Sequence, residues 1–546
     1  EQINQKIPAL LPKYIDVERE RKQGFEMELY IKPVSEIYTQ STEVKRMVVI
    51  MSVLAFALLF VAAMNYILNS VSSLPIRARS VGVHKCNGAS SKDIFNMFLF
   101  ETAALFVVAL VCMALLLFAF REYVADMAAV PTLGTLLNAQ TIWLPAIMIL
   151  AIFILSALLP ARLFSVIPVT QVFRVSTSGK QGWKRSLLFI QFGGIAFVIT
   201  LLVIVLLQYD RLMNNDLGYD PENIVYAPLN NMDDQKTAKL TAELKKLPYV
   251  MATGLSSMDI LSGYGGFPIL DNEKNWLFTA RQVNYNADYL SLMKIPLLEG
   301  QPLKGDGDIL VNESFVSKRG WTDGAIGKYI YDDEGNLKGK IVGVTRDFMV
   351  NSFFTPQLPV IMFGSDRMSY CNFTVRVSEL TPEYLREMND RIAELFPDED
   401  VGFTVLKTII ESQYEGTRHF RDGVFVASIA ILLITLMGLL GYITDEMHRR
   451  SKEIAIRKVN GATAPNILRL LSKDVLITAF PAILLGVIAS RVVGESWLRQ
   501  FADKISLTVF IFISTALLVL AIIWGCVILK SWNIANENPV RSIKNE

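Results

Sequence analysis

The same short phrase occurs twice in this chain. Arg79 to Ser90 reads RSVGVHKCNGAS, and Lys452 to Thr463, 373 positions later, reads KEIAIRKVNGAT. Each copy follows one strongly apolar segment and precedes another. The identical pairs are Lys85/Lys458, Asn87/Asn460, Gly88/Gly461 and Ala89/Ala462. This duplicated basic connector indicates an internal repeat, in which one mechanical element is used twice.

The composition places the chain partly in a membrane and partly in water. Of its 546 residues, 52% are hydrophobic and only 19% are charged, which is too apolar for one water-soluble domain. The net charge of +1 argues against nucleic-acid binding, which needs a large and clustered basic excess. The His and Cys residues are scattered without CxxC or HxxxH spacing, so we expect neither a bound metal nor a disulfide framework.

Seven segments are long and apolar enough to cross a bilayer as helices. The first, MVVIMSVLAFALLFVAAMNYIL, would cover about 33 Å at about 1.5 Å per residue, which is enough for the hydrocarbon core. It lacks the polar residues at helical spacing that a buried water-soluble helix would show. The predicted spans lie near residues 47–68, 99–119, 141–159, 187–208, 422–443, 475–494 and 507–529.

Basic residues in the short loops give the predicted orientation. The loops around 70–98, 160–186 and 445–474 are rich in Arg and Lys, whereas the connections 120–140 and 495–506 are nearly neutral. The positive-inside rule therefore places the basic loops in the cytoplasm. With seven crossings, the first residues lie outside and the last residues inside.

The repeat extends beyond the connector. Residues 3–12 (INQKIPALLP) resemble residues 388–397 (MNDRIAELFP), and a Pro-Val pair follows the third span of each half within 167–174 and 538–544. The second half also has its own opening span and a complete outer domain. By symmetry, we expect a parent protein with eight spans, whose first span and first outer domain lie upstream of Glu1.

The segment between the fourth and fifth predicted spans shows mixed α/β signals. Two βαβ units flank an insertion at 257–370, which predicts an α+β domain on a split βαβ plan with a second, strand-rich lobe. Residues 408–421 run without a strong break into the fifth span, which predicts a continuous helical stalk. The flanking elements are predicted strands at 224–229, 250–256, 373–377 and 401–406, and helices at 233–247 and from 382 onward.

The second connector resembles a known family. The run RSKEIAIRKVNGA from Arg450 to Ala462 is similar to the R-x-x-E-I-[GA]-[IL]-R-[KR]-x-x-G-A pattern of FtsX/MacB-like ABC-transporter permeases, and acidic Asp474 also fits. In the outer domain, residues 288–300 (DYLSLMKIPLLEG) and the short runs that follow them resemble the MacB-type periplasmic core domain. Together, these matches cover most of the chain and resemble the long permeases with two four-span repeats.

The resemblance implies a polytopic α-helical membrane protein with an α+β extracytoplasmic domain and two tandem FtsX-like membrane repeats. Such a protein lies in the bacterial inner membrane with its large domain on the periplasmic side. The predicted domains are the end of a first extracytoplasmic domain with its stalk (1–42), the first membrane repeat (43–175), the opening span of the second repeat (176–208), a MacB-like periplasmic core domain (209–421) with an inserted lobe (257–370) and a stalk (408–421), and the second membrane repeat (422–546).

In the resembled family, the connector binds the ATP-binding subunit, so the resemblance implies two docking sites. An apolar stripe of Ile454, Ile456 and Val459 would remain for packing, and Asn460-Gly461 would permit a sharp turn. The predicted docking residues are Arg450, Glu453, Ile454, Ile456, Arg457, Lys458, Asn460, Gly461 and Ala462 in the second copy, and Arg77, Val81, Val83, Lys85, Asn87, Gly88 and Ala89 in the first.

The first connector departs from the family pattern. Ser80 replaces Glu453, and His84 replaces Arg457. We therefore expect a strong docking point in the second repeat and a weakened one in the first.

The chain lacks a nucleotide-binding motif of its own. No GxxxxGK[ST] phosphate loop occurs, since Gly-Lys pairs such as Gly327-Lys328 lack the spacing and the hydroxyl residue. No nucleophile elbow or catalytic constellation is evident in the outer domain either. We expect no enzyme activity and no directly bound cofactor, with ATP and Mg²⁺ held by separate ABC ATPase subunits.

The function implied by the resemblance is that of a permease subunit. It would couple ATP hydrolysis by the separate ATPase to motions of periplasmic domains, for export, efflux or extraction of a lipoprotein, peptide or drug. Membrane lipid and a periplasmic or outer-membrane protein are further expected partners. The alternative is an ATPase-linked transmembrane regulator or sensor, whose periplasmic domain binds a ligand or controls a partner enzyme.

An ion-coupled secondary transporter is a third class of function. Such a transporter needs ionisable groups or unwound helices near the membrane midplane. The predicted spans offer only the neutral residues Asn65 and Gln191 there. The sequence therefore favours the ATPase-linked classes.

Overall fold

The structure is a computed structural model whose contacts divide the chain into two compact units. The sheet unit comprises residues 1–40, 211–415 and 500–504, and the helical unit comprises residues 41–210, 416–499 and 505–546. The described residues are 4–22, 29–33, 42–72, 74–128, 130–138, 141–165, 182–230, 234–258, 260–261, 265–271, 273–332, 334–350, 354–365, 370–397 and 401–535. The two Pro-Val segments lie outside these ranges.

The helical unit contains the membrane spans. In the described part of the chain, seven helices are long and apolar enough to cross a membrane, and they overlap all seven predicted spans. Large apolar side chains such as Phe100, Phe118 and Leu529 are 69–77% exposed on their outer faces, as expected of helices that face lipid. These helices are α4 (Thr42–Ser72), α6 (Ser91–Ala119), α9 (Trp143–Ser165), α11 (Gly182–Asn214), α17 (Glu415–Arg449), α19 (Ala464–Leu498) and α20 (Val509–Ala535).

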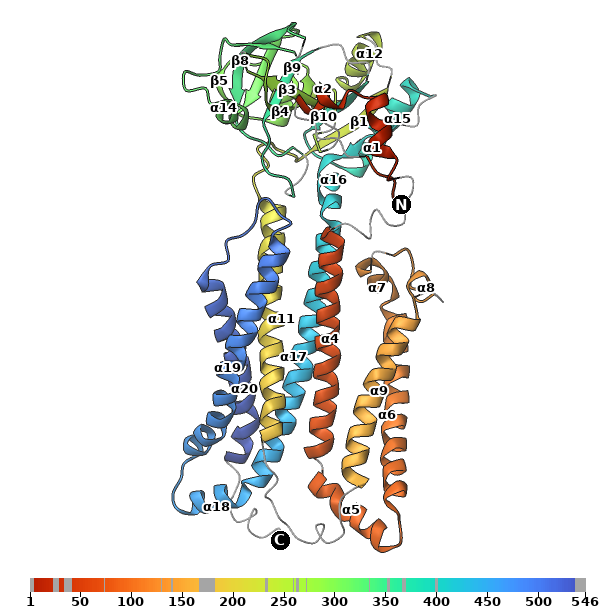
Figure 1. Ribbon diagram of the computed structural model, residues 1–546, viewed down its shortest axis with the longest axis vertical. Helices are drawn as coiled ribbons and strands as arrows, with labels where there is room; N and C mark the ends of the chain where they lie inside the picture. Colours follow the sequence, from red (N-terminus) through yellow and green to blue (C-terminus); the bar gives the residue numbers. More distant parts are fainter. Residues whose placement is uncertain are drawn as a thin grey trace. The chain divides into compact units, whose positions relative to one another are not determined.

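Short helices join the long ones in the helical unit. Helix α5 (Leu74–Cys86) and helix α18 (Ser451–Val459) lie at the same end of the bundle and correspond to the two connectors (Figure 1). Helices α7 (Arg121–Met127) and α8 (Leu133–Leu136) lie in the connection between α6 and α9. The structure thus confirms a polytopic α-helical membrane protein.

The sheet unit contains a mixed eleven-stranded sheet with the order β11-β1-β10-β2-β4-β9-β6-β8-β5, with β3 paired to β4 and β7 paired to β8. Its strands are β1 (Ile224–Asn230), β2 (Val250–Ser256), β3 (Gly265–Leu270), β4 (Trp276–Tyr285), β5 (Leu297–Gly300), β6 (Asp308–Asn312), β7 (Tyr329–Tyr331), β8 (Leu337–Thr345), β9 (Val360–Gly364), β10 (Tyr370–Val377) and β11 (Thr404–Val405). Its helices are α1 (Ile7–Leu10), η1 (Leu11–Lys13), α2 (Val17–Lys22), α12 (Asp234–Leu244), α13 (Tyr289–Met293), α14 (Glu313–Arg319), α15 (Pro382–Leu395) and α16 (Leu406–Gln413).

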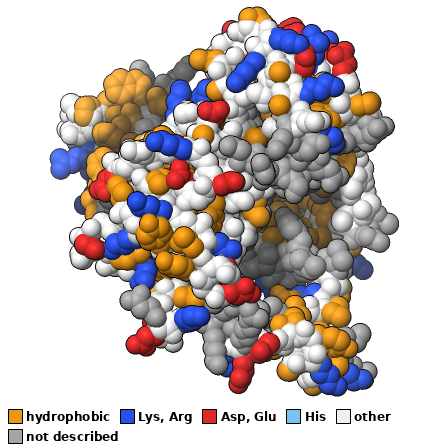
Figure 2. Space-filling view, turned by 90° about the horizontal axis from the view of Figure 1, so that it is seen from above, with side chains coloured by type: hydrophobic (Ala, Val, Ile, Leu, Met, Phe, Trp, Pro, Cys, Tyr) orange, Lys and Arg blue, Asp and Glu red, His pale blue; other side chains and the backbone are white. Residues whose placement is uncertain are grey.

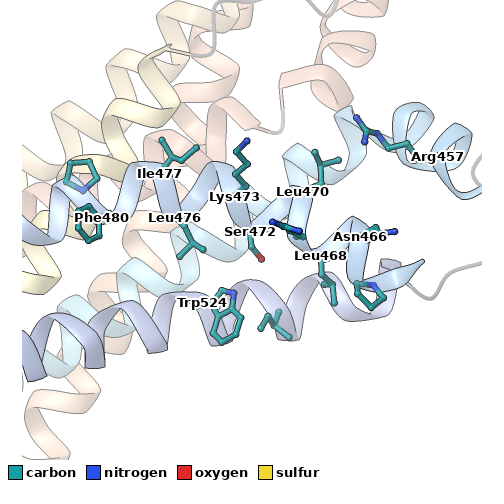
Figure 3. Close-up of a pocket in the computed structure, with 14 residues that line it drawn as sticks. Arg457, Asn466, Leu468, Leu470, Ser472, Lys473, Leu476, Ile477, Phe480 and Trp524 are labelled. Atoms are coloured by element: carbon teal, nitrogen blue, oxygen red, sulfur yellow. The ribbon is translucent and has the colours of Figure 1, made fainter. Parts of the chain in front are cut away.

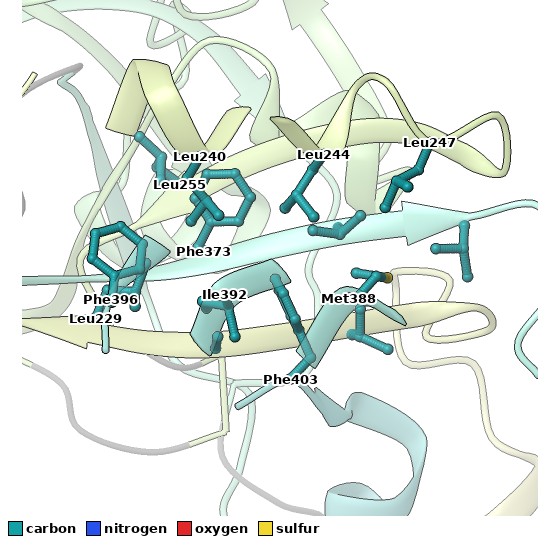
Figure 4. Packing of buried hydrophobic residues seen from close by; sticks show 14 of the residues in the cluster. Leu229, Leu240, Leu244, Leu247, Leu255, Phe373, Met388, Ile392, Phe396 and Phe403 are labelled. Atoms are coloured by element: carbon teal, nitrogen blue, oxygen red, sulfur yellow. The ribbon is translucent and has the colours of Figure 1, made fainter. Parts of the chain in front are cut away.

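The first lobe confirms the split βαβ plan. Strand β10 lies between β1 and β2 and is antiparallel to both, so β1 and β2 are parallel to each other with α12 as their crossover. Strand β11 pairs antiparallel with β1 and completes the second unit through α15. Leu240 and Leu244 of α12 and Met388 and Ile392 of α15 pack in one core against the strands (Figure 4).

Helix α15 begins where the sequence signals predict. The Thr381 hydroxyl oxygen accepts a hydrogen bond from the Tyr384 backbone N–H at 3.2 Å, and Pro382 occupies the first turn, where no intrahelical donor is needed. The apolar residues Met388 and Ile392, four positions apart, then face the sheet. The start signals and the apolar spacing thus agree, and together they place the apolar face of α15 against the core.

The second lobe is strand-rich, as predicted for the insertion. Strand β9 pairs in parallel with β4 and antiparallel with β6, and Ile309, Val311, Ile341 and Ile361 form its buried core with Phe315 of α14. A single residue pair, Ser256 with Tyr285, joins β2 to β4 and makes the two lobes one sheet. On the face seen in Figure 2, acidic and basic side chains are interspersed, which is typical of a solvated surface.

Two predictions for this unit are wrong in detail. The closing strand predicted at 401–406 is only Thr404–Val405, because Leu406 begins α16 and is buried. The predicted continuous stalk is interrupted at Tyr414, which ends α16 before α17 begins at Glu415. The Tyr414 ring is 1% exposed and packs 5.9 Å from the Phe354 ring, so its burial against the sheet unit explains the break.

Arg376 is the main polar anchor of the sheet unit. Its side chain, on β10, donates hydrogen bonds to the backbone oxygens of Leu292 (2.7 Å), Asp220 (2.8 Å) and Glu222 (3.0 Å), and lies 3.2 Å from the Asp220 carboxylate. Lys294 also pairs with that carboxylate, at 2.7 Å. Burial raises the pKa of the Asp220 carboxyl, but these partners offset burial and hold the pKa below its usual value.

We predict that Arg376→Met destabilises the sheet unit locally. The change leaves one buried and two part-buried carbonyls without their donor and leaves Lys294 as the cation that remains paired with the Asp220 carboxylate, so the free energy of opening around β10 and α13 should fall by about 3 kcal/mol. Hydrogen exchange of the full-length protein measures this. The matched control is Lys407→Met, which removes an exposed ion pair with Glu222 and should cost less than about 1 kcal/mol. Equal effects of both changes would contradict the anchoring role.

Candidate functional site

The two connectors end in the same backbone turn. Gly88 and Gly461 have φ values of +94° and +88°, in the left-handed region where glycine is unstrained. The Ala89 N–H donates to the His84 oxygen at 3.0 Å, and the Ala462 N–H donates to the Arg457 oxygen at 2.9 Å. An ideal Cβ at either glycine would meet nothing within 4 Å, so backbone conformation rather than space requires glycine. The repeat therefore preserves the geometry of the turn as well as its residues.

The burial pattern of the two connectors also matches. Val81 and Ile454 are 0% and 4% exposed, whereas Val83 and Ile456 are 54% and 61% exposed. In the first copy, Val81 packs with Ile94, Phe98 and Ala161. Val81 thus holds α5 against its own spans, and Ile454 is buried at the corresponding position of α18.

The predicted apolar stripe is therefore divided between two faces. Ile454 points into the helical unit, while Ile456 and Val459 (68% exposed) remain on the surface. The reason is the helical period, because residues two positions apart lie on opposite sides of a helix. Val81 and Ile454 are predicted docking residues that the structure makes unavailable to a partner.

Lys85 also binds inside its own repeat. Its Nζ donates a hydrogen bond to the Ser165 backbone oxygen at the end of α9, at 2.9 Å. A lysine near the last carbonyls of a helix stabilises that end. Lys85 thus positions α5 relative to α9. Lys458, its counterpart, is half-buried, as are Ala89 and Ala462 beyond the two turns.

A buried ionic cluster fixes the second connector. Arg450, which precedes α18, is bound to Glu446 of α17 and lies 2.5 Å from the Asp474 carboxylate of α19. Arg185 of α11 approaches the same carboxylate at 3.4 Å. The Arg450 and Glu446 side chains are 16% and 8% exposed. Four helical elements therefore meet in this cluster, which we name the Arg450 cluster.

Arg450 keeps its charge in this cluster. Burial lowers the pKa of the Arg450 guanidinium, but Glu446 and Asp474 more than offset this effect and hold the pKa above its usual value. Arg450 is thus a structural residue rather than a contact for a partner. Its sequence counterpart in the first repeat is Arg77, whose side chain lies outside the described part of the structure.

The exposed face of α18 carries a second, different ion pair. The Arg457 guanidinium lies 2.8 Å from the Glu453 carboxylate, with the two side chains 51% and 43% exposed. Ser80 and His84 are exposed at the corresponding positions of α5. The residues available to a partner are therefore Glu453, Ile456, Arg457, Val459, Asn460 and Gly461 in the second copy, and Ser80, Val83, His84, Cys86, Asn87 and Gly88 in the first.

The helices that follow the turns begin differently. Ser90 forms a capping box with Asp93, since its hydroxyl accepts from the Asp93 N–H at 3.3 Å and the Asp93 carboxylate accepts from the Ser90 N–H at 2.8 Å. Thr463 has no such side-chain cap, and Asn466 replaces Asp93. The helix after the first connector, α6, is thus better capped than its counterpart α19.

The two neutral polar residues predicted in the spans, Asn65 and Gln191, lie in the bundle interior. The Asn65 amide of α4 donates to the Ile434 backbone oxygen of α17 at 2.9 Å, next to Gly438. Gln191 of α11 is 0% exposed and lies beside the same glycine. The Asn65 amide thus joins α4 to α17, as interhelical hydrogen bonds of neutral amides do in membranes, whereas the buried Gln191 amide has no hydrogen-bond partner among the described residues. Within the described ranges, no three His, Cys, Asp or Glu side chains gather as a metal site.

Comparison with known proteins identifies the two repeats. Residues 52–169 and 425–539 match the family described as FtsX-like permease C-terminal. Each matched region contains one connector and the spans around it. A search of curated proteins found no match.

Solved structures resemble this chain only distantly. The periplasmic region of MacB from Actinobacillus actinomycetemcomitans is 13% identical, with a TM-score of 0.28 over 37% of this chain and 97% of that one. The extracellular domain of the noncanonic ABC-type transporter YknZ from Gram-positive bacteria is 12% identical, with a TM-score of 0.24 over 33% of this chain and 98% of that one.

We predict that Arg450→Gln loosens α18, whereas Arg457→Gln does not. Loss of Arg450 leaves Glu446 buried without its cation, so the free energy of opening at α18 should fall by about 3 kcal/mol. The exposed Arg457–Glu453 pair should contribute less than about 1 kcal/mol. Hydrogen exchange over residues 446–462 of the full-length protein distinguishes the two variants. A similar loss in both would show that the Arg450 cluster does not hold the connector.

Proposed function

We propose that this chain, whose two membrane repeats belong to the FtsX-like permease family, is the permease subunit of an ABC transporter that works with a separate ATPase. The observation that carries the proposal is the pair of connectors at one end of the bundle, with the same turn and the same exposed positions. A permease needs such a paired contact, since an ATPase dimer presents two equivalent surfaces. Mg²⁺ and ATP are held on that partner.

The exposed faces of the connectors are suited to protein contact. Ile456 and Val459 give α18 an apolar surface, and the Glu453–Arg457 pair lies beside it. An apolar centre with a charged rim is typical of protein interfaces. The first connector offers Val83 and His84 at the matching positions. We infer that α18 is the stronger docking point and α5 the weaker one.

The Arg450 cluster would transmit movement from the docking point. A displacement of α18 acts through Arg450 on Glu446 of α17 and on Asp474 of α19, and through Asp474 on Arg185 of α11. The pairs of Arg450 with Glu446 and Asp474 are largely buried and resist separation, so α17 and α19 move with the connector, and the half-exposed Arg185 adds a weaker link to α11. Helix α17 continues in sequence into α16 of the sheet unit. ATP-driven closure of the ATPase would thus reach the periplasmic domain without passage of cargo between the spans.

The substrate would be handled on the periplasmic side. The sheet unit has a strand-rich second lobe that continues the sheet of the split βαβ lobe, and we infer that this lobe contacts a partner protein or a substrate. We infer export or extraction of a lipoprotein, a peptide or a drug, with a periplasmic or outer-membrane protein as a further partner. Crosslinking from residues 257–370 identifies that partner.

We predict that Ile456→Asp uncouples the permease from its ATPase. A buried carboxylate at the apolar contact should reduce the amount of ATPase bound to the purified full-length protein about tenfold. The permease is co-expressed with the ATP-binding subunit that copurifies with it, and the ATP hydrolysis and subunit stoichiometry of the complex measure the effect. Val83→Asp should have a smaller effect, because its connector lacks the Glu453–Arg457 pair.

The control is Leu337→Asp, an exposed apolar residue of the sheet unit (55% exposed) that should leave ATPase binding unchanged. A wild-type chain that retains no ATPase would overturn the proposed function. A wild-type complex that Ile456→Asp leaves intact would overturn only the docking role of α18.

A further inference from the structure

A groove lies between α19 and α20, beside the end of α18 (Figure 3). Its volume is about 1170 Å³, which exceeds the roughly 300–1,000 Å³ of most small-molecule sites. Ile477 (61% exposed), Phe480 (67%) and Trp524 (49%) leave much of their apolar surface uncovered there. The groove therefore has room for a ligand with a long apolar part.

One face of α19 changes character along the groove. Arg469, Lys473, Leu476 and Phe480 follow the i, i+4, i+7, i+11 spacing that places residues on one side of a helix. Two cations thus lie at the end near the connector, and apolar side chains continue from them into the span. The stripe extends over about 16 Å at about 1.5 Å per residue, which is close to one leaflet of a hydrocarbon core about 30 Å thick.

The charges of the groove have one sign. None of its fourteen lining residues is acidic, and three of them are Arg457, Arg469 and Lys473. Arg469 and Lys473 are exposed and form no ion pair with any residue of the described ranges. The adjacent Asp474 does not neutralise them, because it is bound to Arg450 and Arg185. The groove is thus complementary to an anion attached to an apolar chain.

We propose that the groove between α19 and α20 is a binding site for an anionic phospholipid of the cytoplasmic leaflet. Arg469 and Lys473 bind the headgroup phosphate, and an acyl chain lies along Leu476, Phe480 and Trp524. Basic pockets between spans on the cytoplasmic side select anionic headgroups in this way. A free phosphate would leave the apolar part of the groove exposed, and an apolar partner helix would leave the cations unpaired. This site does not depend on the proposed ATPase contact.

The test uses Trp524 as a reporter. Full-length protein is placed in phosphatidylcholine nanodiscs that contain a minor fraction of either phosphatidylglycerol or phosphatidylcholine with brominated acyl chains, and the Trp524 signal is taken as the difference between wild type and Trp524→Phe. Brominated phosphatidylglycerol should quench Trp524 more strongly. Arg469→Gln and Lys473→Gln should each reduce the preference roughly fivefold. Lys530→Gln should leave it unchanged, since Lys530 is an exposed cation of α20 outside the groove.

Equal quenching by the two brominated lipids in the wild type would overturn the proposal, because any headgroup would then satisfy the groove. A preference that persists in the Arg469→Gln/Lys473→Gln double variant would also overturn it. The absence of quenching by either lipid would overturn it as well, because a polypeptide rather than an acyl chain would then cover Trp524. Gel filtration of each variant confirms folding, and the Lys530→Gln variant separates specific binding from the general loss of one positive charge.

Discussion

The position of α18 depends on one buried cation. Arg450 lies between Glu446 and Asp474, and these partners belong to helices that precede and follow the connector. A charge with 16% of its side chain exposed is stable only when both carboxylates remain in place, since each group compensates the desolvation of the others. Because of these pairs, the nine-residue helix α18 at the membrane surface is held rigidly to the spans. The exposed residues of α18 are therefore held in a fixed arrangement before any partner binds.

The internal repeat shows which properties of the connector both copies retain. The turn glycines, the buried Val81 and Ile454, and the exposed Val83 and Ile456 correspond in both halves. The glycines set the direction of the backbone, and the alternation of buried and exposed residues sets which face of each connector packs against the spans. The copies differ in the charges on the outward face, where Ser80 and His84 replace Glu453 and Arg457. The structural frame is thus duplicated, while the surface offered to a partner has diverged.

Sequence reasoning succeeded where a signal is local. Seven spans, the Asn-Gly turn and the Thr381-Pro382 helix start each depend on residues close together in the chain. It failed where distant residues decide the outcome. The burial of Tyr414 against Phe354 breaks the stalk, and the pairing of Arg450 with Asp474 buries an arginine that the resemblance implied as a docking residue. The Glu446–Arg450 spacing of four was visible in the sequence, but its burial requires the packed spans.

The basic loop of the second repeat also shows why charge counting is an incomplete guide. The positive-inside rule treats Arg450, Arg457, Arg469 and Lys473 alike. In the structure, Arg450 forms ion pairs inside the protein, and Arg457 pairs with Glu453 on an exposed helix face. Arg469 and Lys473 lie beside an apolar groove that has no acidic lining residue. Of these four, only Arg469 and Lys473 form no ion pair within the described ranges and are free to attract an external anion. Leu476 and Phe480 follow them along α19 and offer an apolar surface to a chain attached to that anion. The same four charges thus have three different environments, which are the protein interior, an exposed helix face and an apolar groove.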